Sequence, residues 1–223
     1  MKITRTFFAL TAAAAALAAM PAAAQVNGIA TSSPEAAIAS AAARTQGYGA
    51  ISQTYATQIQ QINTLRQQAR DLQVSLDTNG DGQLTQAEAQ ANPNVQTQLQ
   101  GLQQQIDTAG RPAQIAQIYV IEQIVQRYEA AQQQVIQQKG IQMMLTPEAF
   151  QYAPQGVDVT QDIVTALNTL MPTVNTAPPA NYQPTRGAVE AHQAIQQLLL
   201  VAAEQQQAQA QAQQPEQQAP SGR

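Results

Sequence analysis

Apolar residues alternate at spacings of three and four through the middle of this chain, and this rhythm constrains the fold more than any other feature. It predicts helices that each pack along one narrow face, as in a coiled coil. The first stripe consists of Tyr55, Ile62, Leu65, Ala69, Leu72 and Leu76. The rhythm resumes at Val95, breaks at Gly110-Arg111-Pro112 and then runs to Val135. Two such segments facing each other predict a long antiparallel coiled-coil arm over residues 50–139.

The faces opposite these stripes are built from glutamine and alanine. Of the 223 residues, 44 are Gln and 43 are Ala, whereas only 11% are charged and 4% are aromatic. Ordinary globular domains are about 25% charged, so the solvated surface must be largely neutral here. Large apolar residues are too few to fill a wide core, which favours a slender arm over a helical-bundle core. A Gln-rich surface is also typical of disorder, but the sustained heptads argue against disorder for residues 50–139.

The first 24 residues have the three-part layout of a secretory signal peptide. Lys2 and Arg5 give a positive start, an Ala-dominated apolar run extends from Phe7 to Met20, and small residues follow, which predicts cleavage after Ala24. A membrane anchor is the alternative, but the run is shorter than the ~20 residues that a spanning helix needs. The rest of the chain has no other apolar stretch near that length. We therefore expect a periplasmic protein with no transmembrane segment in the mature chain.

Short strands and helices are expected on both sides of the arm. The strands are predicted at 26–31, 141–145 and 149–152. A small Ala-rich helix is predicted at 34–44, with Ser33 as its N-cap and Pro34 in its first turn. A second helix is expected to begin at Thr160 as its cap and to end before Pro172; its buried side is Ile163, Val164, Leu167 and Leu170.

The end of the chain divides into three segments by composition. Residues 172–186 are rich in Pro, Asn and Thr, and we expect them to form a linker. Residues 187–204 carry enough spaced apolar residues for a final helix. In residues 205–223 Gln, Ala and Pro continue without an apolar period, which predicts a disordered tail.

The residue types that enzymes and metal centres rely on are scarce. The chain has no Cys, which excludes disulfides, thiolate nucleophiles and Cys-based metal sites. Its single histidine, His192, lies among Gln and Ala in an expected helix, and we expect it to be solvated. No glycine-rich phosphate loop of the G-x-x-x-x-G-K-[ST] kind occurs. We therefore do not expect an enzyme.

The charge balance bears on the partners of the protein. The full chain has a formal charge of −4, and removal of the signal peptide with Lys2 and Arg5 leaves −6. An acidic chain is a poor candidate for binding nucleic acid, which attracts basic surfaces.

The most specific motifs lie between residues 141 and 168. They are Tyr152-Ala153-Pro154, then Asp158-Val159-Thr160-Gln161-Asp162-Ile163-Val164, then Ala166-Leu167-Asn168. Together with the order of signal peptide, strand, two long helices, two strands and a helix, they resemble the Skp/OmpH family of periplasmic chaperones over about 26–171. The Asp-Val-Thr segment alone predicts a helix cap, so it supports the fold and marks no active site.

The resemblance implies a mainly α protein with a small β body. Residues 25–49 and 140–171 would form a trimerisation body, from which three arms project and enclose a cavity in a jellyfish-like fold. It also implies an ATP-independent holdase that binds unfolded outer-membrane proteins. A homotrimer is expected from the strands as well, because three short strands are too few to bury a core within one chain. Well-studied members are basic, whereas this chain is acidic, so no lipid site is carried over.

Residues 77–88 fit the twelve-residue EF-hand loop at each defining position, and would form an insertion at the arm tip. Oxygen-bearing side chains alternate along the loop, and Gly82 at position six permits its sharp turn. A hard cation requires six to eight oxygens within about 2.5 Å. The expected calcium ligands are Asp77, Asn79, Asp81, the backbone carbonyl of Gln83, Thr85 through a water, and Glu88.

The same loop has a simpler interpretation as a polar turn that reverses the arm, because Asn-Gly-Asp-Gly forms turns by itself. The loop also has no second copy to pair with. If calcium binds, we expect a structural role and a dissociation constant of ~10⁻⁴ M or weaker.

Two functions from different classes stay open on the sequence. The first is a holdase chaperone for outer-membrane proteins. The alternative is a structural coiled-coil protein of the envelope, stabilised by calcium or not, whose final helix and Gln-rich tail bridge other components without a chaperone role. A calcium sensor is disfavoured as the main role, because one unpaired loop supplies little switching energy.

Overall fold

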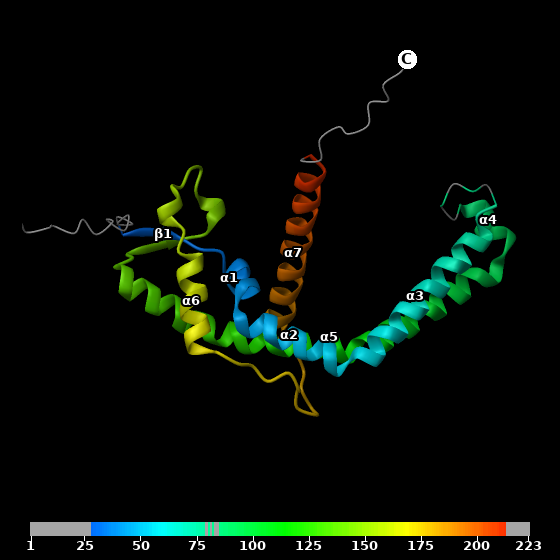
Figure 1. Cartoon of the computed structure of the whole chain (residues 1–223), viewed down its shortest axis with the longest axis horizontal. Helices are drawn as coiled ribbons and strands as arrows, with labels where there is room; N and C mark the ends of the chain where they lie inside the picture. The colour runs from blue at the N-terminus through cyan, green and yellow to red at the C-terminus, as the bar shows by residue number, and fades with distance from the viewer. Residues whose placement is uncertain (1–27, 79, 81, 83–84, 213–223) are drawn as a thin grey trace, which may run out of the picture.

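The computed structural model describes residues 28–78, 80, 82 and 85–212, so the expected signal peptide and residues 213–223 lie outside the described residues. Most of the described chain is helical, as the sequence predicts (Figure 1). The helices are α1 (Pro34–Ser40), α2 (Ala42–Thr54), α3 (Ala56–Leu76), α4 (Gln86–Ala91), α5 (Pro93–Lys139), α6 (Thr160–Leu170) and α7 (Arg186–Ala212). The strands are β1 (Ile29–Thr31) and β2 (Met143–Leu145), and the 3-10 turns are η1 (Pro147–Ala149) and η2 (Gln155–Val157).

Helix α5 is the longest element, with 47 residues, and it runs through the whole molecule (Figure 1). Helix α3 lies along its first half and leads outward to α4, while α5 leads back. Helices α1, α2, α6 and α7 contact α5 as well, at the other end of the molecule. We call that end, made of β1, α1, α2, β2, α6 and the second half of α5, the body.

The expected break of the helix at Gly110-Arg111-Pro112 is wrong, because α5 continues through Pro112. Proline removes one helical hydrogen bond and bends a helix, but packing on both sides can carry the helix through. Ile62 of α3 lies over Gly110, 3.6 Å from where a Cβ atom would be, and Val120 lies against Gly47 of α2. These two contacts place the α2–α3 junction at Tyr55 near the level of Pro112, and Figure 1 shows both helical layers bending together there.

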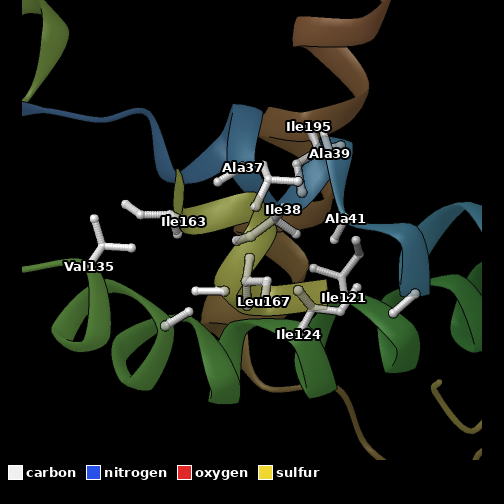
Figure 2. Packing of buried hydrophobic residues seen from close by; sticks show 14 of the residues in the cluster. Ala37, Ile38, Ala39, Ala41, Ile121, Ile124, Val135, Ile163, Leu167 and Ile195 are labelled. Carbon is white, nitrogen blue, oxygen red and sulfur yellow. The ribbon is translucent and has the colours of Figure 1, made fainter. Parts of the chain in front are cut away.

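The body has its own hydrophobic core, made by helices. Large apolar residues of α1, α5, α6 and α7 interlock around the alanines of α1, which allow close approach (Figure 2). The labelled members are Ala37, Ile38, Ala39, Ala41, Ile121, Ile124, Val135, Ile163, Leu167 and Ile195. The expectation that one chain buries no core is therefore wrong, because it counted strands and ignored an Ala-lined helical interface. The scarcity of strands therefore no longer supports a trimer, and the trimer stays a prediction.

The sheet has two strands, β1 and β2, which pair in parallel with Ile29 opposite Met143 and Thr31 opposite Leu145. The strand expected at 149–152 is absent: Ala149 belongs to η1, and no ladder includes residues 149–152. Pro147 and Pro154 flank this segment, and proline fixes φ and donates no ladder hydrogen bond. Instead of a third strand, a single parallel bridge joins Thr31 of β1 to Asp158.

Three hydrogen bonds tie α6 and its motif residues to the N-terminal segment. The N–H of Val159 donates to the carbonyl of Thr31 at 2.9 Å, and that of Ser33 to Oγ1 of Thr160 at 3.0 Å. The N–H of Ala42 donates to Oδ1 of Asn168 at 2.8 Å. Within the motif itself, the N–H of Thr160 donates to Oδ1 of Asp158 at 2.8 Å.

Two expectations about helix ends need correction at these bonds. Thr160 is the first residue of α6 and not its cap: Val159 takes the N-cap position, and the Thr160 hydroxyl accepts from Ser33. The Asp158 side chain, two residues before Thr160, accepts the Thr160 N–H. The helix expected at 34–44 is two helices that meet at Ala41, because Asn168 accepts the bond of the next N–H. Ser33 does cap α1, accepting the N–H of Ala36 at 3.1 Å.

Residues 171–185, which cover most of the linker expected at 172–186, cross α5 as a strap. Gln123 of α5 exchanges two hydrogen bonds with the backbone of Asn175, at 2.9 and 3.0 Å. The hydroxyl of Tyr182 donates to the carboxylate of buried Glu122, and its ring meets Tyr119 edge-on at 4.8 Å. We call residues 171–185 the strap.

Helix α7 follows the strap and is longer than the predicted 187–204, since it extends to Ala212. The disordered tail expected from 205 is therefore wrong up to that residue. Alanine and glutamine have high helix propensity even where no apolar period is present.

Gly47 and Gly49 of α2 offer a matched pair that tests how the strap docks. A Cβ atom at Gly47 would lie 2.8 Å from Val174 of the strap, whereas nothing lies within 4 Å of one at Gly49. Gly49→Ala should raise the free energy of unfolding by about 0.5–1 kcal/mol, and Gly47→Ala should lower it by about 1–3 kcal/mol through overpacking. Urea unfolding of both variants measures the difference. Equal stabilisation by both would mean that the strap does not press on α2.

Candidate functional site

The first half of α5 and helix α3 form a paired-helix arm that extends away from the body (Figure 1). Its seam is narrow: Leu65, Leu76 and Val95 are buried, whereas Ile62 and Ile106 are only half-buried. The outward positions are mostly exposed glutamines. The arm therefore presents amide groups that donate and accept hydrogen bonds, with few large apolar groups.

Two open grooves run along the arm between α3 and α5. The first is lined by Gln61, Gly101, Gln104, Gln105, Thr108 and Ala109. The second is lined by Ile62, Arg66, Ile106, Asp107, Gly110, Arg111 and Gln114. Gly101 and Ala109 hollow the first groove, where their small side chains leave the neighbouring glutamines above the helix surface. The second groove has Gly110 at its floor, and it carries the charged side chains of Arg66, Asp107 and Arg111. Such a surface can contact an extended polypeptide at many weak points.

The carboxylate of Glu88 joins the two ends of the tip loop by hydrogen bonds to Thr78 and Thr85. Its Oε1 accepts from the N–H and hydroxyl of Thr78 at 2.7 and 2.8 Å, and its Oε2 accepts from the N–H and hydroxyl of Thr85 at 2.9 and 2.8 Å. Glu88 is only 8% exposed. These hydrogen bonds, the one from the Thr85 N–H foremost, lower the pKa of Glu88 to about 2.

Thr85 and Glu88 also form a capping box at the start of α4. The Thr85 hydroxyl accepts the N–H of Glu88 at 3.4 Å while the Glu88 side chain returns to the Thr85 N–H. The T-x-x-E spacing is a sequence signal for this motif, which the metal interpretation of the same residues overlooked. Glu88 thus has a structural role in the absence of any cation.

Asp77 organises the other end of the loop. Its Oδ1 accepts the N–H of Gly80 and its Oδ2 that of Gly82, both at 2.7 Å. Both glycines have φ above +70°, a conformation that side chains disfavour. Of the other expected ligands, Thr85 is described, whereas Asn79, Asp81 and Gln83 lie outside the described residues. Among the residues that are described, no three His, Asp or Glu side chains gather as a metal site.

The order of these parts matches a known family. The family model described as Outer membrane protein (OmpH-like) matches residues 22–167. The chain belongs to the OmpH-like family. No curated protein and no solved structure matches the chain.

The OmpH-like match extends across β1, the whole arm and its tip, and most of α6. The family includes periplasmic chaperones that bind outer-membrane proteins, and its members are not enzymes. Within the described residues, no helix has the length and apolar character needed to span a membrane. The strap and α7 lie beyond the OmpH-like match.

His192 of α7 contradicts the expectation of a solvated histidine, since it is only 6% exposed. Its Nδ1 is hydrogen-bonded to the hydroxyl of Tyr48 in α2 at 3.1 Å. The guanidinium of Arg44 lies over the Tyr48 ring, 5.1 Å from its centroid. Burial lowers the pKa of His192 and raises that of Tyr48 to about 12. The sequence missed this contact because α2 and α7 lie far apart in the chain.

The contact between α7 and α2 at His192 should therefore contribute less to the free energy of unfolding at acidic pH. Because its pKa is lowered, His192 is neutral in the folded protein. The stability that the neutral ring contributes is complete above the unfolded-state pKa of ~6.5, and it is lost as the pH falls through the lower pKa of the folded state. Between pH 7.5 and 5.5 the wild type should lose up to about 1.4 kcal/mol more than His192→Gln. Urea unfolding at both pH values measures this. An equal loss in both proteins would contradict the buried neutral histidine.

Proposed function

We propose that this OmpH-like protein is an ATP-independent periplasmic holdase chaperone for unfolded outer-membrane proteins. The observation that carries the proposal is the arm: two paired helices that project from the body within the family match. Two open grooves run between these helices, one lined mostly by glutamines and one that also carries charged side chains. An unfolded client contacts such grooves at many points, and multivalency raises the net hold without one strong site.

Three chains form the working unit in this proposal, with their arms around one cavity. The support lies at the sheet, where β1 and β2 pair only with each other among the described strands and where Ile29 and Met143 are 44% and 52% exposed. The edge of a sheet presents unpaired N–H and C=O groups that can pair with a strand of another chain. The antiparallel coiled-coil arm and its trimeric assembly are part of this proposal.

The uncharged lining of the first groove sets the direction of a mutational test. Adding two negative charges with Gln104→Glu and Gln105→Glu should weaken the hold on an acidic client several-fold by repulsion. The matched control is Gln206→Glu with Gln207→Glu, on exposed positions of α7. A urea-denatured β-barrel outer-membrane protein is diluted into each protein, and light scattering follows its aggregation. Wild type and control should keep the client soluble without ATP.

The same experiment distinguishes the chaperone from a structural envelope protein. Size-exclusion chromatography with light scattering gives the mass of the free protein, for which the proposal requires three chains, and the stoichiometry of the client complex. Aggregation of the client at the same rate with and without the protein favours the structural role. A monomeric mass at micromolar concentration contradicts the enclosed cavity.

We also propose that the tip loop binds calcium with a structural role. The ligands are Asp77, Asn79, Asp81, the Gln83 carbonyl, Thr85 through a water, and Glu88. Two described features support it. The backbone N–H groups of Gly80 and Gly82 already donate to the Asp77 carboxylate, and the pKa of Glu88 is lowered to about 2, so its carboxylate stays ionised at neutral pH. A cation at this loop would neutralise part of the negative charge of three carboxylates.

Calcium at millimolar concentration should shift the amide signals of Thr78 and Thr85, since both N–H groups donate to Glu88. Glu88→Gln should lose the response, whereas Glu204→Gln, an exposed carboxylate of α7, should keep it. Calorimetric titration gives the dissociation constant, expected at ~10⁻⁴ M or weaker. Holding of the client should not change with calcium. Equal and negligible responses in all three proteins would make the loop a polar turn only.

A further inference from the structure

The strap shows how a helix of this protein holds a segment that is neither helix nor strand. The side-chain N–H of Gln123 in α5 donates to the carbonyl of Asn175 at 2.9 Å, and its side-chain oxygen accepts the N–H of Asn175 at 3.0 Å. The preceding residue, Val174, lies against Gly47 of α2, where a Cβ atom would be only 2.8 Å from it. One glutamine and one glycine on adjacent helices thus hold two consecutive residues. We call the two hydrogen bonds between a glutamine side chain and the N–H and C=O of one residue a glutamine clamp.

A glutamine clamp depends on no side chain of the segment that it binds. Every residue except proline carries one backbone N–H and one C=O, and a glutamine amide offers both a donor and an acceptor. Two residues of neighbouring antiparallel strands exchange the same pair of hydrogen bonds. The glutamine therefore supplies what a partner strand would supply, and it suits polypeptides of varied sequence.

The first groove of the arm lies on the same side of α5 as the residues that hold the strap. Those that contact the strap through hydrogen bonds or ring packing are Tyr119, Glu122 and Gln123. The residues eighteen positions earlier, all of which line the first groove, are Gly101, Gln104 and Gln105. Eighteen residues are five turns of an α-helix. Gln105 is therefore the arm's counterpart of the clamping glutamine.

The surroundings of Gln105 correspond to those of the strap as well. The strap contacts α2 and α5, the groove lies between α3 and α5, and α2 and α3 follow one another along α5 (Figure 1). Gly101, one turn before Gln105, has nothing within 4 Å of where a Cβ atom would be. Gln105 is exposed, and its side chain makes no hydrogen bond within the part of the chain that the structure describes. The groove thus offers an amide and a glycine recess to a segment from outside.

We propose that Gln105 binds the backbone of an unfolded client through a glutamine clamp, with a neighbouring client residue over Gly101. From Gly101 to Ala109 the groove extends about 12 Å along the helix. About four residues of extended chain span that length at about 3.3 Å each. The bound element is therefore a short extended segment, recognised by its peptide groups and not by its side chains. This inference rests on the holdase function proposed above, and it adds the chemistry by which the arm recognises a client.

A pair of peptides tests the clamp directly, because a backbone ester removes an N–H donor without adding bulk. The probe is a fluorescently labelled, uncharged peptide of alternating Ser and Thr, and its partner carries esters in place of alternate peptide bonds. Fluorescence anisotropy at protein concentrations up to the millimolar range gives both dissociation constants. The ester peptide should bind wild type about tenfold more weakly, since it loses hydrogen bonds to the glutamine amide.

Two matched substitutions assign the effect to Gln105. Gln105→Ala keeps the helix, because alanine has the highest helix propensity, and it should reduce the difference between the two peptides at least twofold. Gln100→Ala, at an exposed position of the same helix that does not line the groove, should keep the full difference.

The outcomes separate the clamp from the holdase function. Equal binding of both peptides to wild type, no binding of either, or an undiminished ester effect in Gln105→Ala overturns the clamp. If wild type keeps a denatured β-barrel protein soluble but binds both peptides alike, the holdase function stands without the clamp. If the ester effect depends on Gln105 while the β-barrel protein still aggregates, the clamp is present and the holdase function is wrong.

Discussion

Burial of the apolar faces of α5 is the interaction on which the rest of the structure depends. The helix passes from the arm into the body without a break, and α1, α2, α3, α6 and α7 each pack against it. Val120, Ile121 and Ile124 are almost completely buried there, which stabilises the body by about 1.5–3 kcal/mol for each such side chain. The same helix supplies Leu99 and Ile106 to the arm. One helix therefore sets the position of the arm relative to the body.

The polar contacts of the body fix how its segments are arranged around α5. Asp158, Thr160 and Asn168 bind one another or the N-terminal segment, so the family motif acts as a set of structural clasps. Lys139 at the end of α5 adds an ion pair with Asp162 at 2.8 Å. The strap is attached through Gln123 and buried Glu122. Such attachments keep the body rigid, while the arm keeps a narrow seam and an open, amide-rich surface.

The sequence predicted well wherever local pattern decides the outcome. The heptad stripes, the Ser33 cap and the buried side of α6 at Ile163, Val164 and Leu167 are found in the structure. Leu170, expected on the same side, is 42% exposed, so that part of the prediction is wrong. Pro112 was misjudged because α3 and α2 pack against α5 on either side of it, a tertiary effect. His192 was misjudged for the same reason, since Tyr48 reaches it from a distant segment. For the tip, the Glu88 capping box was readable from T-x-x-E, and the metal site stays a prediction.

The continuity of α5 through Pro112 is the most direct test of this account. Spin labels on cysteines introduced at exposed Gln105 and Arg127 would be separated by 22 residues, or about 33 Å along a straight helix. The account predicts a single narrow distance distribution slightly below that value, because the helix bends at one place and does not flex. A broad distribution reaching much shorter distances would show a hinge at Pro112, and the arm would then not be held by the body.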